Sequence, residues 1–291
     1  MVIEMNGAKI KMIVSMAIFG TIGIFVNYIN VPSSLIAVCR GFTGALFLCL
    51  FMIVTGKKIS FSDIKKNFLK LSITGCFIGI NWILLFESYN YIGVANGTLC
   101  YYLEPVILVL GASIIYKEKI SPVKAVCVAV ALFGMVFVSG VFPPSEDAVL
   151  NPVGIALGVG AALFYASVVL INRSVKNISS YDMTMVQLFF AAVVALPYVL
   201  ITEDVTAINF NPVTVILLLV VGIIHTGVAY ALYFGAVREL NSQTVAVLSY
   251  IDPMLAIVLS MIILPEEKFA PCGIFGAILI LGSTFVSELK K

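Results

Sequence analysis

The sequence has little charge and almost no histidine. Only 11% of its 291 residues are Asp, Glu, Lys or Arg, and 61% are hydrophobic, whereas a soluble domain carries about 25% charged residues. So little charge cannot cover a water-exposed surface, and no hydrophilic block is long enough to form a separate soluble domain. The net charge of +2 argues against a nucleic-acid partner. The chain is therefore expected to face lipid.

The motifs of common enzyme classes are also missing. The single histidine excludes a His-based metal cluster, and the six cysteines contain no CxxC pair. The sequence has no P-loop, no HExxH motif and no glycine-rich nucleotide fingerprint. One histidine and scattered acids supply no nucleophile–base constellation either. We expect neither an enzyme nor an ATP-driven pump, and neither a metal ion nor another cofactor.

The chain is instead rich in apolar runs. A helix needs roughly 20 apolar residues to cross a hydrocarbon core of about 30 Å, and continuous rather than alternating hydrophobicity predicts helices instead of barrel strands. The pattern predicts an all-α, multi-pass membrane protein of ten transmembrane helices. The predicted spans are 12–29, 33–54, 70–90, 94–116, 122–141, 152–172, 182–201, 212–236, 242–264 and 270–288.

Loop charges predict the orientation. Cytoplasmic loops of membrane proteins are rich in Lys and Arg. With the N-terminus inside, all but two of the 17 basic residues fall on the cytoplasmic side, the exceptions being Arg40 within a span and Lys268. The opposite side carries mostly acids, such as Glu203 and Asp204. Both termini are thus predicted to be cytoplasmic, in the inner (plasma) membrane of the cell.

The two halves of the sequence repeat each other. One gapless offset places Tyr102 on Tyr250 and also matches the acid–proline pairs Glu104-Pro105 and Asp252-Pro253 and the glycines Gly134 and Gly282. Each repeat has an odd number of spans, so the second copy enters the membrane inverted. Inverted repeats are typical of secondary transporters that work by alternating access, and suit a channel less well. The predicted division is a first repeat at 1–141, an external linker at 142–151 and a second repeat at 152–291.

Two motifs carry a resemblance to a known family. The stretch Leu99-Cys-Tyr-Tyr-Leu-Glu-Pro-Val-Ile-Leu-Val, which leads to Tyr116-Lys-Glu-Lys-Ile, resembles the signature of EamA-type carriers of the drug/metabolite transporter superfamily. Its echo Tyr250-Ile-Asp-Pro carries the same resemblance. The resemblance covers the whole chain. It implies a ten-helix bundle around a central cavity formed by spans one to four and six to nine. Some members dimerise through spans five and ten, which makes a second copy of the chain a candidate partner beside lipid and solute.

Charged side chains inside a bilayer cost about 2.5–3.5 kcal/mol each on insertion scales and so mark candidate functional sites. Glu104 and Asp252 lie mid-span, each directly before a proline (Pro105 and Pro253) that interrupts the helix. The acids could bind an ammonium group, a proton or a cation. Alternatively, the pairs could hold a bend or act in gating, and both interpretations remain open.

Arg40 and Glu87 are two further charged residues deep within spans, and both lie in the outer half. Their long side chains could meet in a buried ion pair, which would give Arg40 a structural role. Alternatively, Glu87 could bind the cationic group of a solute and Arg40 its carboxylate. His225 is either a hydrogen-bonded core residue or part of a proton relay.

Aromatic and polar residues near the predicted midplane complete the candidate cavity, since aromatic rings can stack on solutes or hold ammonium groups. The candidate substrate-binding residues are Asn81, Trp82, Glu87, Tyr101, Tyr102, Glu104, Tyr165, His225, Tyr230, Tyr250 and Asp252. Acids among aromatics, together with the resemblance, favour export of amino acids or related amines. A nucleoside-type or other neutral metabolite is the alternative solute.

Overall fold

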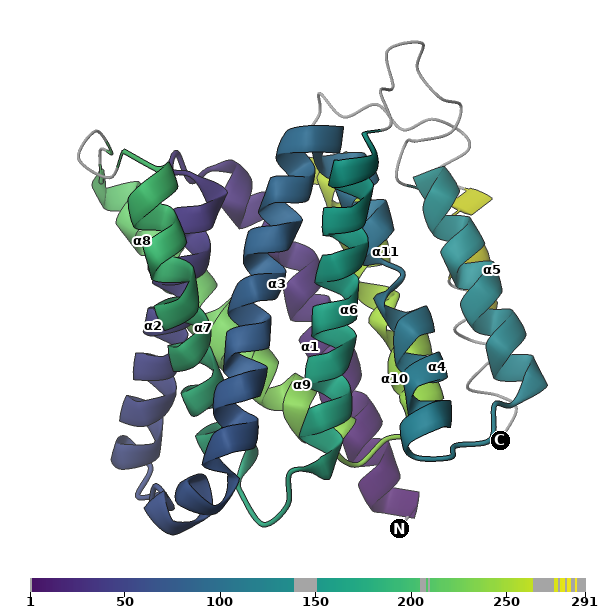
Figure 1. Cartoon of the computed structure of the whole chain (residues 1–291), viewed down its shortest axis with the longest axis horizontal. Helices are drawn as coiled ribbons and strands as arrows, with labels where there is room; N and C mark the ends of the chain where they lie inside the picture. Colours follow the sequence, from purple (N-terminus) through teal and green to yellow (C-terminus); the bar gives the residue numbers. More distant parts are fainter. Residues whose placement is uncertain are drawn as a thin grey trace.

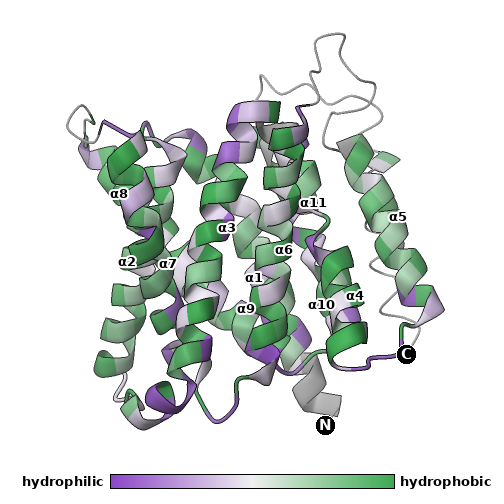
Figure 2. Cartoon of the chain, in the orientation of Figure 1, coloured by the Kyte–Doolittle hydropathy of each residue, from purple (hydrophilic) through white to green (hydrophobic). Residues whose placement is uncertain are grey.

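Long apolar helices run side by side through the computed structural model (Figure 1). The structure describes residues 2–138, 151–204, 208, 210–263 and, near the end of the chain, 275–276, 278–280, 282–283 and 286. Figure 2 shows hydrophobic residues along most of the length of these helices and hydrophilic ones mainly towards their ends. Hydrophobic side chains along the helices suit a lipid-facing surface. The helices also satisfy most of their backbone hydrogen bonds internally, as lipid requires.

The first half of the chain forms five helices that match the first five predicted spans. A break inside the third helix falls at Gly93, whose φ of 76° only glycine adopts without strain. That break separates the third predicted span from the fourth. The helices are α1 (Val2–Asn27), α2 (Ser33–Val54), α3 (Phe61–Tyr101), α4 (Glu104–Ile115) and α5 (Pro122–Val138).

The second half repeats this order. Two of its spans are each made of consecutive helical pieces, and one piece is a π-helix, a form that often occurs near functional sites. The elements are α6 (Pro152–Ser174), α7 (Ser180–Thr202), α8 (Pro212–Val220), η1 (Val221–Val228), α9 (Ala229–Val237), α10 (Ser242–Ser249) and α11 (Ile251–Ile263).

The predicted spans agree broadly with these helices, with several differences. Helix α1 starts at Val2, ten residues before the predicted 12–29 run. Helix α3 begins before the predicted 70–90 span, and the predicted 94–116 span is divided between the end of α3 and α4. The predicted 242–264 span is divided into α10 and α11. Seven helices of the described chain have the length and hydropathy to cross a membrane alone. The protein is thus an all-helical, multi-pass membrane protein.

Equivalent helices of the two halves have equivalent neighbours. Helix α3 packs on α6 and α7, and its counterpart, the η1–α9 segment, packs on α1 and α2. Helix α4 likewise lies against α6, and its counterpart α11 lies against α1. Helices α10 and α4 also lie against each other. The interface between the halves is therefore built twice from the same parts.

Backbone-to-backbone contact between α3 and α7 requires small residues. A Cβ added at Gly79 would lie 2.6 Å from the carbonyl oxygen of Ala191, and one at Gly75 would lie 2.7 Å from that of Gln187. Such small-residue contacts let membrane helices approach closely.

We expect Gly79→Ala to destabilise the bundle by about 1–3 kcal/mol, because the added methyl group forces α3 away from α7. Gly7→Ala is the matched control, since a Cβ there has nothing within 4 Å. Thermal unfolding of the purified proteins in detergent measures both. Equal melting temperatures for the two variants would contradict the close packing.

Candidate binding cavity

A cavity of about 760 Å³ lies between the two halves. At one end it reaches Asn27 and Ser33, where α1 ends and α2 begins, and Asn27 is exposed. At the other end it stops at Met16, Tyr165 and Tyr233, which are all buried. The cavity is therefore open towards one end of the bundle and closed in the middle.

Two helix breaks place acids on the cavity wall. Helix α3 ends at Tyr101 and α4 begins at Glu104, and in the repeat α10 ends at Ser249 and α11 begins at Ile251, directly before Asp252. Both acids line the cavity. Pro105 lies in the first turn of α4, where its missing N–H is unpaired in any helix. The acid–proline pairs thus mark real interruptions at matching positions.

The two breaks touch each other. The Tyr250 hydroxyl donates a hydrogen bond of 3.5 Å to the backbone carbonyl of Tyr102, its counterpart in the first half. Glu104 is only 5% exposed. Its Oε1 has no hydrogen-bond partner among the described residues. A buried carboxylate oxygen without a partner is costly, so it is a strong point of attachment for a hydrogen-bond donor or cation.

Arg40 enters the cavity from α2, with its guanidinium 4.4 Å from the centre of the Trp82 ring on α3. This cation–π contact stabilises the charge where water is scarce. The Arg40 Nε atom has no hydrogen-bond partner in the described part of the chain. Arg40 therefore keeps donor capacity for an acceptor in the cavity.

The predicted ion pair between Arg40 and Glu87 is wrong. The Glu87 carboxylate instead accepts a hydrogen bond from the Tyr198 hydroxyl of α7. The number of residues between Glu87 and the end of its span predicts how deep it lies in the membrane, but not which way its side chain points. The side chain points to α7 rather than to α2. Glu87 also does not line the cavity.

An aromatic cluster closes the inner end of the cavity. Tyr165 stacks on Tyr233 with ring centres 6.1 Å apart, and Tyr101 lies 6.1 Å from Tyr165. Phe19 packs edge-on against Tyr230 at 5.0 Å. These rings come from both halves of the chain, so their contacts change if the halves move relative to each other.

Two further candidates lie outside the cavity wall. His225 is buried and shares a 2.9 Å hydrogen bond with the Thr21 hydroxyl, while its ring packs 4.8 Å from Phe25. Tyr250 is fully buried behind the wall. The predicted residues that do line the cavity are Arg40, Asn81, Trp82, Tyr101, Tyr102, Glu104, Pro105, Tyr165, Tyr230 and Asp252.

Sequence reasoning missed several lining residues. They include Phe19, Tyr89, Thr98, Tyr233 and Ser249. Tyr233 could have been found, because it follows Tyr230 by three residues and so shares its helix face. Asn81 has a partly structural role, since its side-chain N–H donates to the Ala161 carbonyl of α6 at 2.7 Å.

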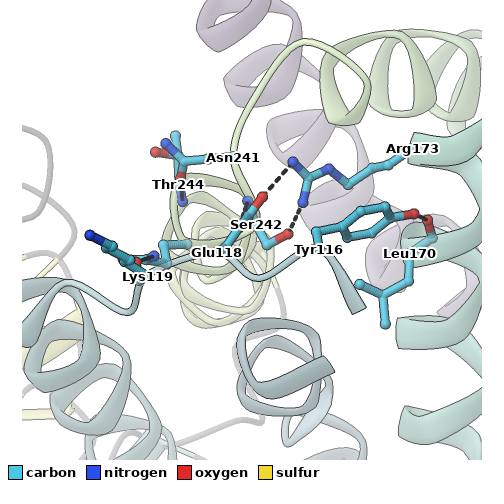
Figure 3. Close-up of polar contacts among 9 residues, drawn as sticks. Tyr116, Glu118, Lys119, Leu170, Arg173, Asn241, Ser242 and Thr244 are labelled. Atoms are coloured by element: carbon cyan, nitrogen blue, oxygen red, sulfur yellow. Dashed lines mark hydrogen bonds and ion pairs between the residues drawn. The ribbon is translucent and has the colours of Figure 1, made fainter. Parts of the chain in front are cut away.

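The far side of the aromatic cluster is held shut by a polar latch, formed by Glu118, Arg173 and Ser242. Glu118 follows α4, Arg173 lies in the last turn of α6, and Ser242 begins α10. Figure 3 shows the Arg173 guanidinium bonded to both partners. Its distance to Glu118 is 2.6 Å, and it also donates to the Ser242 hydroxyl. The latch ties the two halves together at the lysine-rich end of the bundle.

Neighbouring contacts reinforce this closure. The Tyr116 hydroxyl donates to the Leu170 carbonyl at 2.5 Å, and the Arg173 guanidinium lies 5.1 Å from the Tyr116 ring. The Gln243 amide donates to the Lys119 carbonyl at 2.8 Å. Several bonds must therefore break together before this end can open.

A membrane-spanning helical bundle with a cavity that holds three charged side chains, open at one end and latched at the other, is typical of a transporter. The chain belongs to the EamA-like transporter family, whose sequence profile matches residues 8–140 and again 152–288. It is not an enzyme.

Relatives and a solved structure agree with this assignment. The chain is 31% identical over 259 residues to the uncharacterized transporter YxxF of Bacillus subtilis strain 168, covering 89% of this chain and 82% of that one. It is 23% identical to the uncharacterized transporter YoaV of the same organism, covering 89% and 88%. A crystal structure at 16% identity superposes with a TM-score of 0.85 over 98% of this chain and 99% of that chain, which shows the shared fold.

We expect Glu118→Gln to open the latched end more often, because it removes the charge that Arg173 faces. A half-buried pair of this kind is worth about 1 kcal/mol, which corresponds to roughly a fivefold shift in population. With native cysteines replaced, a Ser249→Cys probe in the cavity should then react more slowly with a membrane-impermeant thiol reagent added on the open side.

The matched control is Asp63→Asn, another acid-to-amide change, at an exposed pair with Lys66. It should leave the labelling rate unchanged. The latch has no gating role if Glu118→Gln labels at the control rate.

Proposed function

We propose that this protein is a secondary transporter that moves a small polar metabolite by alternating access. Two inverted five-helix repeats, 1–141 and 152–291, exchange conformations around the shared cavity. The paired neighbours of equivalent helices support the repeat. The inversion is supported by one pocket that contains both Lys11, near the start of α1, and Arg173, near the end of α6, so these counterparts run in opposite directions.

The proposal includes ten membrane-spanning helices with both termini in the cytoplasm of the cell, in its inner (plasma) membrane. Support comes from the lysine-rich end of the bundle, which holds the latch, since positive loops favour the cytoplasmic side. The cavity then faces outward in this conformation. The external linker at 142–151 lies almost wholly outside the described residues, as does much of the tenth span.

We assign the solute class from the charges in the cavity. Glu104 and Asp252 present acids at the helix breaks, and Arg40 presents a guanidinium, all on the wall of one cavity. The unpartnered Glu104 Oε1 and Arg40 Nε are the observation that carries the assignment. A zwitterion satisfies both, with its ammonium group on the acids and its carboxylate on the arginine. Amino acids and related amines are therefore the favoured solutes.

The proposed direction of transport, export from the cell, rests on the family resemblance. A nucleoside-type or other neutral metabolite is the second candidate, favoured by the stacking surfaces of Trp82 and the tyrosines. Dimer formation through α5 and the tenth span stays a prediction. On α5, the exposed side chains of Val126 and Phe133 suit either lipid or a second copy.

We expect Glu104→Gln to weaken amino-acid binding by about 10- to 100-fold, because a charge-assisted contact worth about 1.5–3 kcal/mol is lost. Binding is measured on purified protein by thermal shift against amino acids, polyamines and nucleosides. Transport of the solute that binds is then measured in proteoliposomes.

Glu87→Gln is the matched control, since Glu87 is an acid in a neighbouring span that does not reach the cavity. It should bind the solute within about twofold of the wild type. Stabilisation by nucleosides or uncharged sugars alone would overturn the assignment of a zwitterionic solute and favour a neutral one.

A further inference from the structure

A second pocket, of about 450 Å³, lies at the lysine-rich end of the bundle and is separate from the central cavity. It is formed by the first turns of α1, the segment that joins α6 to α7, and the end of α9. We name it the basic pocket. Its wall consists of Lys11, Arg173, Val175, Lys176, Ser180, Gly235, Arg238 and Glu239.

The basic pocket holds more positive charge than its carboxylates neutralise. Lys11 pairs with Glu239 at 3.1 Å, and Arg173 pairs with Glu118 of the latch. Lys176 and Arg238 make no ion pair within 4 Å among the described residues. Two cations therefore remain without an anionic partner in contact.

Arg238 is the less hydrated of these two cations. It is half-buried, and its guanidinium donates to the backbone carbonyl of Ile178 at 2.7 Å. Burial lowers the pKa of this guanidinium, although the nearby Glu239 raises it. A partly desolvated guanidinium is stabilised by an anion that can replace the lost water.

The shape of the pocket leaves room for such an anion. Gly235 contributes no side chain, and even an added Cβ would stay 3.5 Å from Ser180. The Ser180 hydroxyl supplies a neutral donor beside the cations. Arg and Lys around a hydroxyl form the usual donor set for a phosphate group, since guanidinium groups match its oxygen geometry.

We propose that the basic pocket binds a phosphate-bearing anion, with Lys176 and Arg238 as its charged contacts. The source is either the headgroup of an anionic phospholipid or free phosphate. The pocket lies where three membrane-spanning segments end, at the level of lipid headgroups, and basic pockets of this kind suit anionic lipids. Its placement in the cytoplasmic leaflet rests on the orientation proposed above, whereas the binding itself does not.

Arg173 connects the basic pocket to the latch. Its guanidinium is held by Glu118 and Ser242, and it also forms part of the pocket wall. An anion in the pocket competes with Glu118 for this cation, so occupancy weakens the latch.

The test is the thermal stability of the purified, full-length protein. In detergent, sodium phosphate is compared with sodium chloride at equal ionic strength. In lipid nanodiscs, phosphatidylglycerol is compared with phosphatidylcholine. A hundredfold excess over Kd should raise the Tm by about 5 °C. Stabilisation by phosphatidylglycerol alone assigns a lipid headgroup, and stabilisation by inorganic phosphate assigns free phosphate.

The site variant is K176Q/R238Q, which should lose most of the increase in Tm that the anion produces. Lys65→Gln is the matched control, because Lys65 is an exposed lysine at the same end that does not line the pocket. Gly235→Leu is a second site variant, which fills the pocket without removing a charge. The proposal is overturned if neither anion stabilises the wild type. It is also overturned if the anion raises the Tm of the site variants as much as that of Lys65→Gln. These readouts need no solute, so failure of the proposed transport function would be seen separately.

Discussion

The cost of placing charge in hydrocarbon governs this structure. Each charged side chain within a span must reach water, a partner or a cavity, because an isolated one costs several kcal/mol. Arg40, Glu104 and Asp252 all lie on the wall of one cavity. These three charged side chains thus lie together on one cavity, and the surrounding helices can remain almost entirely apolar.

The same constraint explains how the cavity is closed. Towards the lysine-rich end, the packing of Phe19, Tyr165 and Tyr233 excludes water without burying charge, and the charged latch of Glu118 and Arg173 lies beyond it. An ion pair near the membrane surface can break and re-form at low cost, since water replaces the lost partner. Closure therefore combines an aromatic plug with a polar bond that can re-form.

The two acidic positions of the candidate site could be predicted from the sequence, because the internal repeat places them at equivalent positions. The pairs Glu104-Pro105 and Asp252-Pro253 recur at one offset, and the helices break next to both. The direction of single side chains did not follow. Glu87 and Arg40 have compatible depths, but Glu87 turns towards Tyr198 and Arg40 towards Trp82. Helix rotation, which depends on packing between distant segments, decides such contacts, and the same holds for Tyr250 and His225.

The sequence by itself determined that this is a helical, multi-pass membrane protein, where most of its described helices lie and that its halves are related. Those properties depend on local hydrophobicity, loop charge and repetition, which the chain carries residue by residue. Only the tertiary structure decided which end of the cavity is open, that Arg173 joins Glu118 to Ser242, and that four basic residues surround a second pocket. These contacts join segments far apart in the chain, and helix packing alone brings them together.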